Sequence, residues 1–158
     1  MEVDALFQIG DNIVYPMHGT GKIEAIEEKE ISGETKQYYV IRMLSTNMQV
    51  MIPTEKISNS NIRPVTDIKA LKDIIHIFQH GESDEVQSLK QRFKVNTEKI
   101  KTGKIHENAE VVRDLKRVKK ENTLNTSEKK MFENAQDSLM SELRLIKGIT
   151  ENQIKIFA

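Results

Sequence analysis

Few residues in this chain have both the type and the spacing that chemistry requires. His76 and His80 lie four residues apart, so on a helix their imidazoles would share one face and could bind a metal ion. Zinc sites need three or four ligands, and no third ligand is evident near this pair. The segment GTGK at residues 19–22 lacks the glycine spacing and the Ser/Thr of a phosphate loop. The sequence therefore predicts no metal, no cofactor and no catalytic site.

The basic residues are distributed unevenly along the chain. In total, 24 Lys/Arg balance 24 Asp/Glu among 158 residues. Residues 1–67 hold 6 basic and 10 acidic residues, whereas residues 90–130 hold 13 basic and 6 acidic ones. Such a concentration of positive charge can raise the affinity for a polyanion, although a solvated helix face is the more frequent explanation. Charge alone leaves nucleic acid as a minority hypothesis.

The composition indicates a cytoplasmic protein without a membrane segment. Charged residues make up 30% of the chain, and no segment approaches the ~20 consecutive apolar residues that span a bilayer. The first residues, MEVDALFQIG, lack the basic and apolar regions of a secretory signal. There is no cysteine, so stability must come from packing and hydrogen bonds rather than from disulfides.

The first 67 residues have the pattern of short strands separated by turns. Segments rich in Ile, Val and Tyr occupy residues 12–15, 21–31, 37–44 and 49–53. Ser32, Gly33 and Glu34 favour a hairpin turn between the second and third segments. Pro16 fixes one backbone angle in the first connection. Four or five such strands predict a small β-barrel domain over residues 1–67.

From residue 68 onward the apolar residues follow the period of helices. The first predicted helix ends near Gly81, and Ser83 is expected to begin a second helix, which stops at Gly103. The apolar residues of this second helix include Val86, Leu89 and Phe93. Their spacing favours burial of Leu89 in the core, because stripes of this kind usually pack against a neighbour.

Three more helices are predicted in the rest of the chain. The third ends near Asn122, and Asn125 caps the fourth. Thr150 and Gln153 form a capping-box pattern for a short last helix. The predicted fold is therefore an α+β protein of two domains, in which the β-barrel is followed by an all-α domain of about five helices over residues 68–158.

Two groups of segments give the sequence a specific resemblance. The first group is FQIGDNIVYPMHGTGKIEAIEEKEISGETKQYYVIRM, VMIP and NIRPV, and the second is LKQRFKVNTEKIKTG, ENAEVVRDLKR and SEKKMFENAQDSLMSEL. The first resembles the amino-terminal module of the CarD family of bacterial transcription regulators, which is similar to the polymerase-interacting domain of the transcription-repair coupling factor. The second resembles the helical half of CarD proteins. A coupling factor would need a helicase, and none is present.

The resemblance implies that a Tudor-like barrel binds the β subunit of RNA polymerase, partly through an exposed strand edge. Lys29, Glu30 and Ile31 fall at the polymerase-contact positions of the family, with burial in the core as the alternative for Ile31. Family members often have a second basic contact residue where this chain has Met51. A thioether can be buried but cannot form an ion pair.

The resemblance also implies contacts between the helical half and promoter DNA at the upstream edge of the melted bubble. Leu89 aligns with a family tryptophan that acts as a wedge in the minor groove. Leucine can serve as an apolar wedge, but it loses aromatic stacking of ~1–3 kcal/mol per base. Lys90, Arg92 and Lys94 lie where phosphate contacts are expected. They cannot all share one helix face, so at most two should contact DNA together.

The sequence therefore predicts a monomeric regulator that binds RNA polymerase and changes the stability of the promoter open complex through contacts with DNA that do not depend on sequence. It is not predicted to be an enzyme. One alternative is a protein-interaction adaptor without DNA contact. Another is a small RNA-binding or ribosome-associated protein, which the scarcity of aromatic residues disfavours, with three Tyr, five Phe and no Trp.

Overall fold

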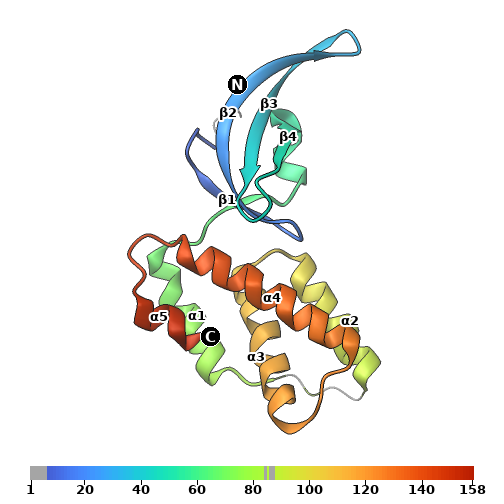
Figure 1. Cartoon of the computed structure of the whole chain (residues 1–158), viewed down its shortest axis with the longest axis vertical. Coiled ribbons are helices and arrows are strands. Elements are labelled where there is room, and N and C mark those ends of the chain that lie inside the picture. Colours follow the sequence, from blue (N-terminus) through green and yellow to red (C-terminus); the bar gives the residue numbers. More distant parts are fainter. Residues whose placement is uncertain (1–6, 84, 86–87) are drawn as a thin grey trace. The chain divides into compact units, whose positions relative to one another are not determined.

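The computed structural model describes residues 7–83, 85 and 88–158 (Figure 1). The chain divides into two compact units, with the boundary between Val65 and Thr66. The first unit contains the strands and the second contains the α-helices, as the α+β prediction requires.

The first unit is built on a five-stranded antiparallel sheet. The strands are β1 (Asn12–Tyr15), β2 (Gly19–Ile31), β3 (Glu34–Met43), β4 (Gln49–Pro53) and β5 (Arg63–Pro64), and a short 3-10 helix, η2 (Thr54–Asn59), follows β4. Their order in the sheet is β4-β3-β2-β1-β5. Within the described residues, β4 and β5 are therefore the edges of a curved sheet.

One face of this sheet encloses the core of the unit. Alternate residues of β3 point to the same face, and Tyr39, Ile41 and Met43 are all buried there. The register between β2 and β3 shifts between Ile23 and Ala25, so a β-bulge bends the sheet around this core. The remaining core residues come from the other elements and from the segments just before β1 and β5: Phe7, Ile13, Ile23, Ile52, Ile57 and Ile62.

Two glycines have specific structural roles in this unit. Gly33 and the preceding Ser32 have φ angles of 80° and 55°, as a two-residue type I′ turn between β2 and β3 requires. The predicted hairpin is thus confirmed. At Gly21, a Cβ atom would lie 2.8 Å from Cγ2 of Ile41. A larger residue there would push β2 away from β3.

The described residues of the second unit form five α-helices. These are α1 (Ile68–His80), α2 (Leu89–Lys101), α3 (Ile105–Glu121), α4 (Thr126–Arg144) and α5 (Glu151–Ile156). The predicted caps of the last two helices are confirmed: Asn125 Oδ1 accepts a hydrogen bond from the amide of Glu128, and Thr150 and Gln153 form a capping box. No helix in the described part of the chain is long and apolar enough to cross a membrane.

The predicted start of the second helix at Ser83 is wrong. Ser88 is the N-cap of α2, and its hydroxyl accepts a hydrogen bond from the amide of Gln91. The Ser83 hydroxyl instead donates to Oδ1 of Asp114 on α3, at 2.6 Å, and therefore does not cap a helix. Val86, which the sequence assigned to the stripe of this helix, lies outside the described residues.

The core of the helical unit lies around α3. This helix contacts α1, α2 and α4, and Figure 1 shows it behind α4. Val111, Val112 and Leu115 of α3 are fully buried, as are Leu139 and Leu143 of α4. The α2 helix differs from the others, because its only buried residue is the polar Asn96. Two ion pairs, Arg92 with Glu128 of α4 and Lys99 with Glu110 of α3, contribute to its attachment.

Candidate functional site

Three of the four residues predicted to contact polymerase share the outer face of the sheet, but only two of them lie near each other. Lys29 and Ile31 are at the tip of the β2–β3 hairpin, whereas Met51 lies further along the sheet on β4. The register pairs Lys29 with Lys36, Ile31 with Glu34, and Met51 of β4 with Val40. Lys36, Val40 and Glu34 are even-numbered residues of β3 and share one face of the sheet. Lys29, Ile31 and Met51 therefore lie on this face too. Glu30 pairs with Thr35 and lies on the opposite face.

Exposure of these side chains decides between contact and core. Ile31 is 56% exposed and Met51 is 38% exposed, so the alternative that Ile31 belongs to the core is wrong. Ile31 is the last residue of β2, just before the two-residue turn. An exposed isoleucine at a hairpin tip offers apolar area to a partner.

The charges on this face are only loosely paired. Lys29 Nζ lies 3.7 Å from an oxygen of Glu27, in a solvent-exposed ion pair that stabilises the fold little. Lys36, directly opposite, contacts Glu55 at 3.1 Å, and this hydrogen bond raises the pKa of the Lys36 ammonium. The carboxylate of Glu55 offsets the repulsion between the two lysines. Lys29 can therefore exchange its weak partner for a carboxylate of another protein.

The outer half of β2 has an open backbone edge. β1 pairs with β2 only along Gly19–Lys22, and no described strand pairs with residues 25–31 on that side. In a hairpin with a two-residue turn, the residues flanking the turn hydrogen bond to each other, and the pattern then alternates. The amides and carbonyls of Ile26, Glu28 and Glu30 therefore point away from β3. They form an edge to which another strand can be added.

Met51 lies in a partly apolar environment. Its cross-strand neighbour Val40 is buried. Arg42, a cation on the same face, is committed to Glu24 through hydrogen bonds of 2.9 and 3.1 Å, which hold the pKa of the Glu24 carboxyl below its usual range. Arg42 is thus not available to replace the basic residue expected near Met51. The contact offered here is apolar.

Leu89, at the start of α2, is 57% exposed. The expectation that its spacing would bury it is therefore wrong. The helix packs inward through Asn96, which is 3% exposed, and through Arg92 and Lys99. These residues recur at i, i+4 and i+7, so a polar stripe takes the inward face that the apolar stripe was expected to occupy.

Arg92 is turned inward by a buried carboxylate. Its Nε and Nη2 donate to the two carboxylate oxygens of Glu128 on α4, at 2.7 and 2.8 Å. The Glu128 side chain is 1% exposed, and the hydrogen bonds raise the pKa of Arg92. Sequence reasoning missed Glu128, because it lies 36 residues from Arg92. Glu128 lies in the first turn of α4, just after its N-cap, where an acidic residue is common and does not indicate an ion pair.

Lys90 and Lys94 occupy a different face of α2. Both are exposed, and at a spacing of four residues they lie one above the other. Within the described part of the chain, the side chain of neither lysine forms an ion pair or a hydrogen bond. Of the three cations predicted to contact phosphate, the structure therefore brings these two together and separates them from Arg92.

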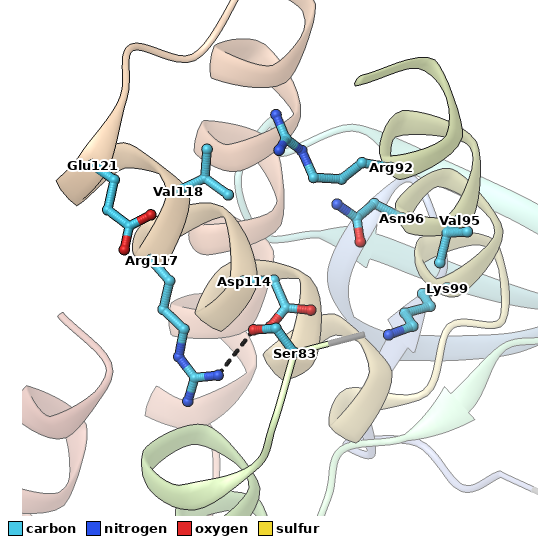
Figure 2. A pocket seen from close by; sticks show the side chains of 9 residues that line it. All are labelled: Ser83, Arg92, Val95, Asn96, Lys99, Asp114, Arg117, Val118 and Glu121. Atoms are coloured by element: carbon cyan, nitrogen blue, oxygen red, sulfur yellow. Dashed lines mark hydrogen bonds between the residues drawn. The ribbon is translucent and has the colours of Figure 1, made fainter. Parts of the chain in front are cut away.

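A cavity of about 300 Å³ lies between α2 and α3 (Figure 2). Three of its polar side chains bond to one another: Arg117 donates to Ser83 at 2.9 Å, and Ser83 donates to Asp114. Lys99 pairs with Glu110 at 3.4 Å. These contacts attach α2 and the segment before it to α3. No group of three potential metal ligands occurs in the part of the chain that the structure describes.

Comparisons with known proteins agree with the two-unit architecture. Residues 7–66 match a family model described as the CarD-like/TRCF RID domain, and residues 73–157 match one described as the CarD C-terminal domain. The chain therefore belongs to the CarD family of transcription factors and combines an RNA polymerase-interacting domain with a CarD C-terminal domain.

One relative resembles the whole chain, and two solved structures resemble part of it. A Bacillus subtilis (strain 168) protein named "Putative transcription factor YdeB" is 71% identical over 152 residues, which cover 96% of this chain and 99% of the relative. The solution NMR structure of the N-terminal domain of Myxococcus xanthus CarD is 29% identical, with a TM-score of 0.32, over 37% of this chain and 77% of that one. CdnLNt from the same organism is 38% identical, with a TM-score of 0.30, over 37% and 79%.

Proposed function

We propose that this protein binds the β subunit of RNA polymerase through its β2–β3 hairpin and changes the lifetime of the promoter open complex through contacts between α2 and DNA. It catalyses no reaction and acts as a cytoplasmic monomer. The observation that carries the proposal is the exposure of Leu89 beside Lys90 and Lys94, two lysines that have no ionic partner in the part of the chain that the structure describes. In a family of transcription factors, an exposed apolar side chain beside two lysines is suited to contact the bases and phosphates of DNA.

The polymerase contact uses both the backbone and the side chains of the hairpin. A strand of the β subunit adds to the open edge at Ile26, Glu28 and Glu30, and main-chain hydrogen bonds supply affinity. Lys29 and Ile31, on the outer face, select the partner through one charge and one apolar contact. Met51 extends the apolar part of this face. Glu30 contributes mainly through its backbone, because its side chain lies on the opposite face.

The DNA contact combines an apolar side chain with phosphate-binding charges. Leu89 lies against a base step at the edge of the melted region, and Lys90 and Lys94 bind phosphates nearby. Arg92, which the sequence placed among these contacts, supports them from inside through Glu128. Phosphate contacts carry no base specificity. Localisation at promoters therefore comes from polymerase.

We expect Lys90→Ala and Lys94→Ala each to reduce the salt dependence of promoter-complex binding. Each neutralised phosphate contributes about 0.9 to the slope of log affinity against log salt concentration, so the double variant should lose roughly 1.8. The measurement is a titration of the full chain on polymerase–promoter complexes from low to high salt. Lys147→Ala, an exposed lysine after α4, is the matched control and should leave the slope unchanged.

An unchanged slope in the double variant would contradict the assignment of these two lysines. If the wild-type chain also bound polymerase without altering the lifetime of the open complex, the protein would instead be an adaptor. RNA recovered by crosslinking in cells would favour an RNA-binding role.

A further inference from the structure

The exposed face of α2 carries two apolar residues rather than one. Phe93 is 37% exposed and follows Leu89 by four residues. On a helix, these two side chains are neighbours, about 6 Å apart along the axis. All eight aromatic residues lie in the described part of the chain, and Phe93 is the only one whose side chain is exposed.

The position of Phe93 around the helix is defined by its neighbours. Successive residues are rotated by about 100°. Going around the helix axis, Leu89 and Phe93 therefore come directly after the inward stripe. Lys90 and Lys94 come next. The apolar pair lies between the stripe that anchors the helix and the two exposed lysines. An aromatic ring beside cations is the arrangement that binds a polyanion with accessible bases.

We propose that Phe93 is a second DNA-contact residue, whose ring stacks on an unpaired base beside the one that Leu89 contacts. This inference rests on the proposed function and adds to it a residue that stacks on an unpaired base at the edge of the melted region. The occupant is nucleic acid because the lysines beside the pair complement phosphate. A ring can stack only on a base that has left the duplex stack, whereas the lysines bind phosphates of either form.

Ion pairs at both ends of α2 hold in place the face that carries Leu89 and Phe93. The bidentate bonds between Arg92 and Glu128 hold the first turn, and Lys99 holds the last turn through Glu110. Leu89 and Phe93 therefore project from a helix attached at both ends. Little ordering of the protein is needed when the bases stack, so most of the stacking energy appears as affinity.

The test compares the affinity of the full-length chain for a forked duplex with its affinity for a fully paired duplex of the same length, by fluorescence anisotropy at low salt. We expect the wild type to prefer the fork about tenfold, as one stacked base would give. Phe93→Ala and Phe93→Leu should abolish this preference, and Phe93→Trp should keep it. Lys90→Ala should weaken binding to both duplexes by a similar factor.

The paired duplex also serves as the folding control, because a variant that binds it as the wild type does has an intact lysine face. A wild-type chain that bound neither duplex would contradict both the DNA contact and the role of Phe93. A wild-type preference for the fork that survived in Phe93→Ala and Phe93→Leu would overturn the role of Phe93 alone. A preference lost in Phe93→Ala but kept in Phe93→Leu would show that apolar bulk suffices and would refute stacking.

Discussion

Replacing Glu128 with alanine should lower the free energy of unfolding of the helical unit by about 3 kcal/mol. The substitution leaves the Arg92 guanidinium, whose side chain is 17% exposed, without its carboxylate, and removing one partner of a buried pair costs about 3–5 kcal/mol. The lower end applies because Arg92 retains some contact with solvent. The measurement is urea denaturation followed by circular dichroism of the helices.

The matched control for this substitution is an exposed lysine of the same helix. Lys130→Ala changes the surface of α4 and should change stability by less than about 0.5 kcal/mol. Replacing Arg92 and Glu128 together by Met and Leu should recover most of the loss, since no unpaired charge remains. If Glu128→Ala is no more destabilising than the control, the ion pair does not hold α2 against α4 as described.

A substitution of Arg92 shows whether this residue only holds α2 in place or itself contacts a DNA phosphate. Arg92→Met should weaken promoter-complex binding through displacement of α2 while leaving the slope of affinity against salt concentration unchanged, because Arg92 neutralises no phosphate. A slope reduced by about 0.9 would instead restore Arg92 to the phosphate contacts that the sequence predicted.

The double substitution Lys29→Glu and Ile31→Glu should reduce the affinity for the β subunit of RNA polymerase by at least about 100-fold. It reverses one charge and places a carboxylate where an apolar contact is expected, and a few such residues usually carry most of the binding energy. Both side chains are exposed, so the sheet should remain folded. The measurement is biolayer interferometry of the full-length chain on immobilised polymerase.

Lys56→Glu provides the control for this variant. Lys56 is an exposed lysine of the same unit that lies in η2 rather than in the hairpin. It should bind polymerase with nearly wild-type affinity. Full association of the double variant would contradict the proposed contact, and equal losses in both variants would indicate a general effect of charge.

Features fixed by neighbouring residues could be predicted from the sequence. The turn at Ser32–Gly33 requires two residues with positive φ, and the caps at Asn125 and Thr150 need only a side chain that reaches an amide three residues later. Turns and caps of this kind depend only on residues that are close together in the sequence. The order of strands and helices followed from these boundaries and from the change in apolar period.

Features fixed by distant residues could not be predicted in the same way. Apolar spacing showed that Leu89 and Phe93 share a face, but not whether anything covers that face. The inward orientation of Arg92 depends on Glu128, and the late start of α2 accompanies a bond between Ser83 and Asp114, 31 residues further along the chain. Contacts at this separation are set by packing, which no local pattern encodes.

Hydrogen exchange of the hairpin in the presence of polymerase tests whether a strand of the partner pairs with β2. We expect the amides of Ile26, Glu28 and Glu30 to exchange rapidly in the free chain and to become protected when the polymerase β subunit binds, because a strand of the partner then accepts their hydrogen bonds. Binding that left the exchange of these three amides unchanged would contradict this pairing.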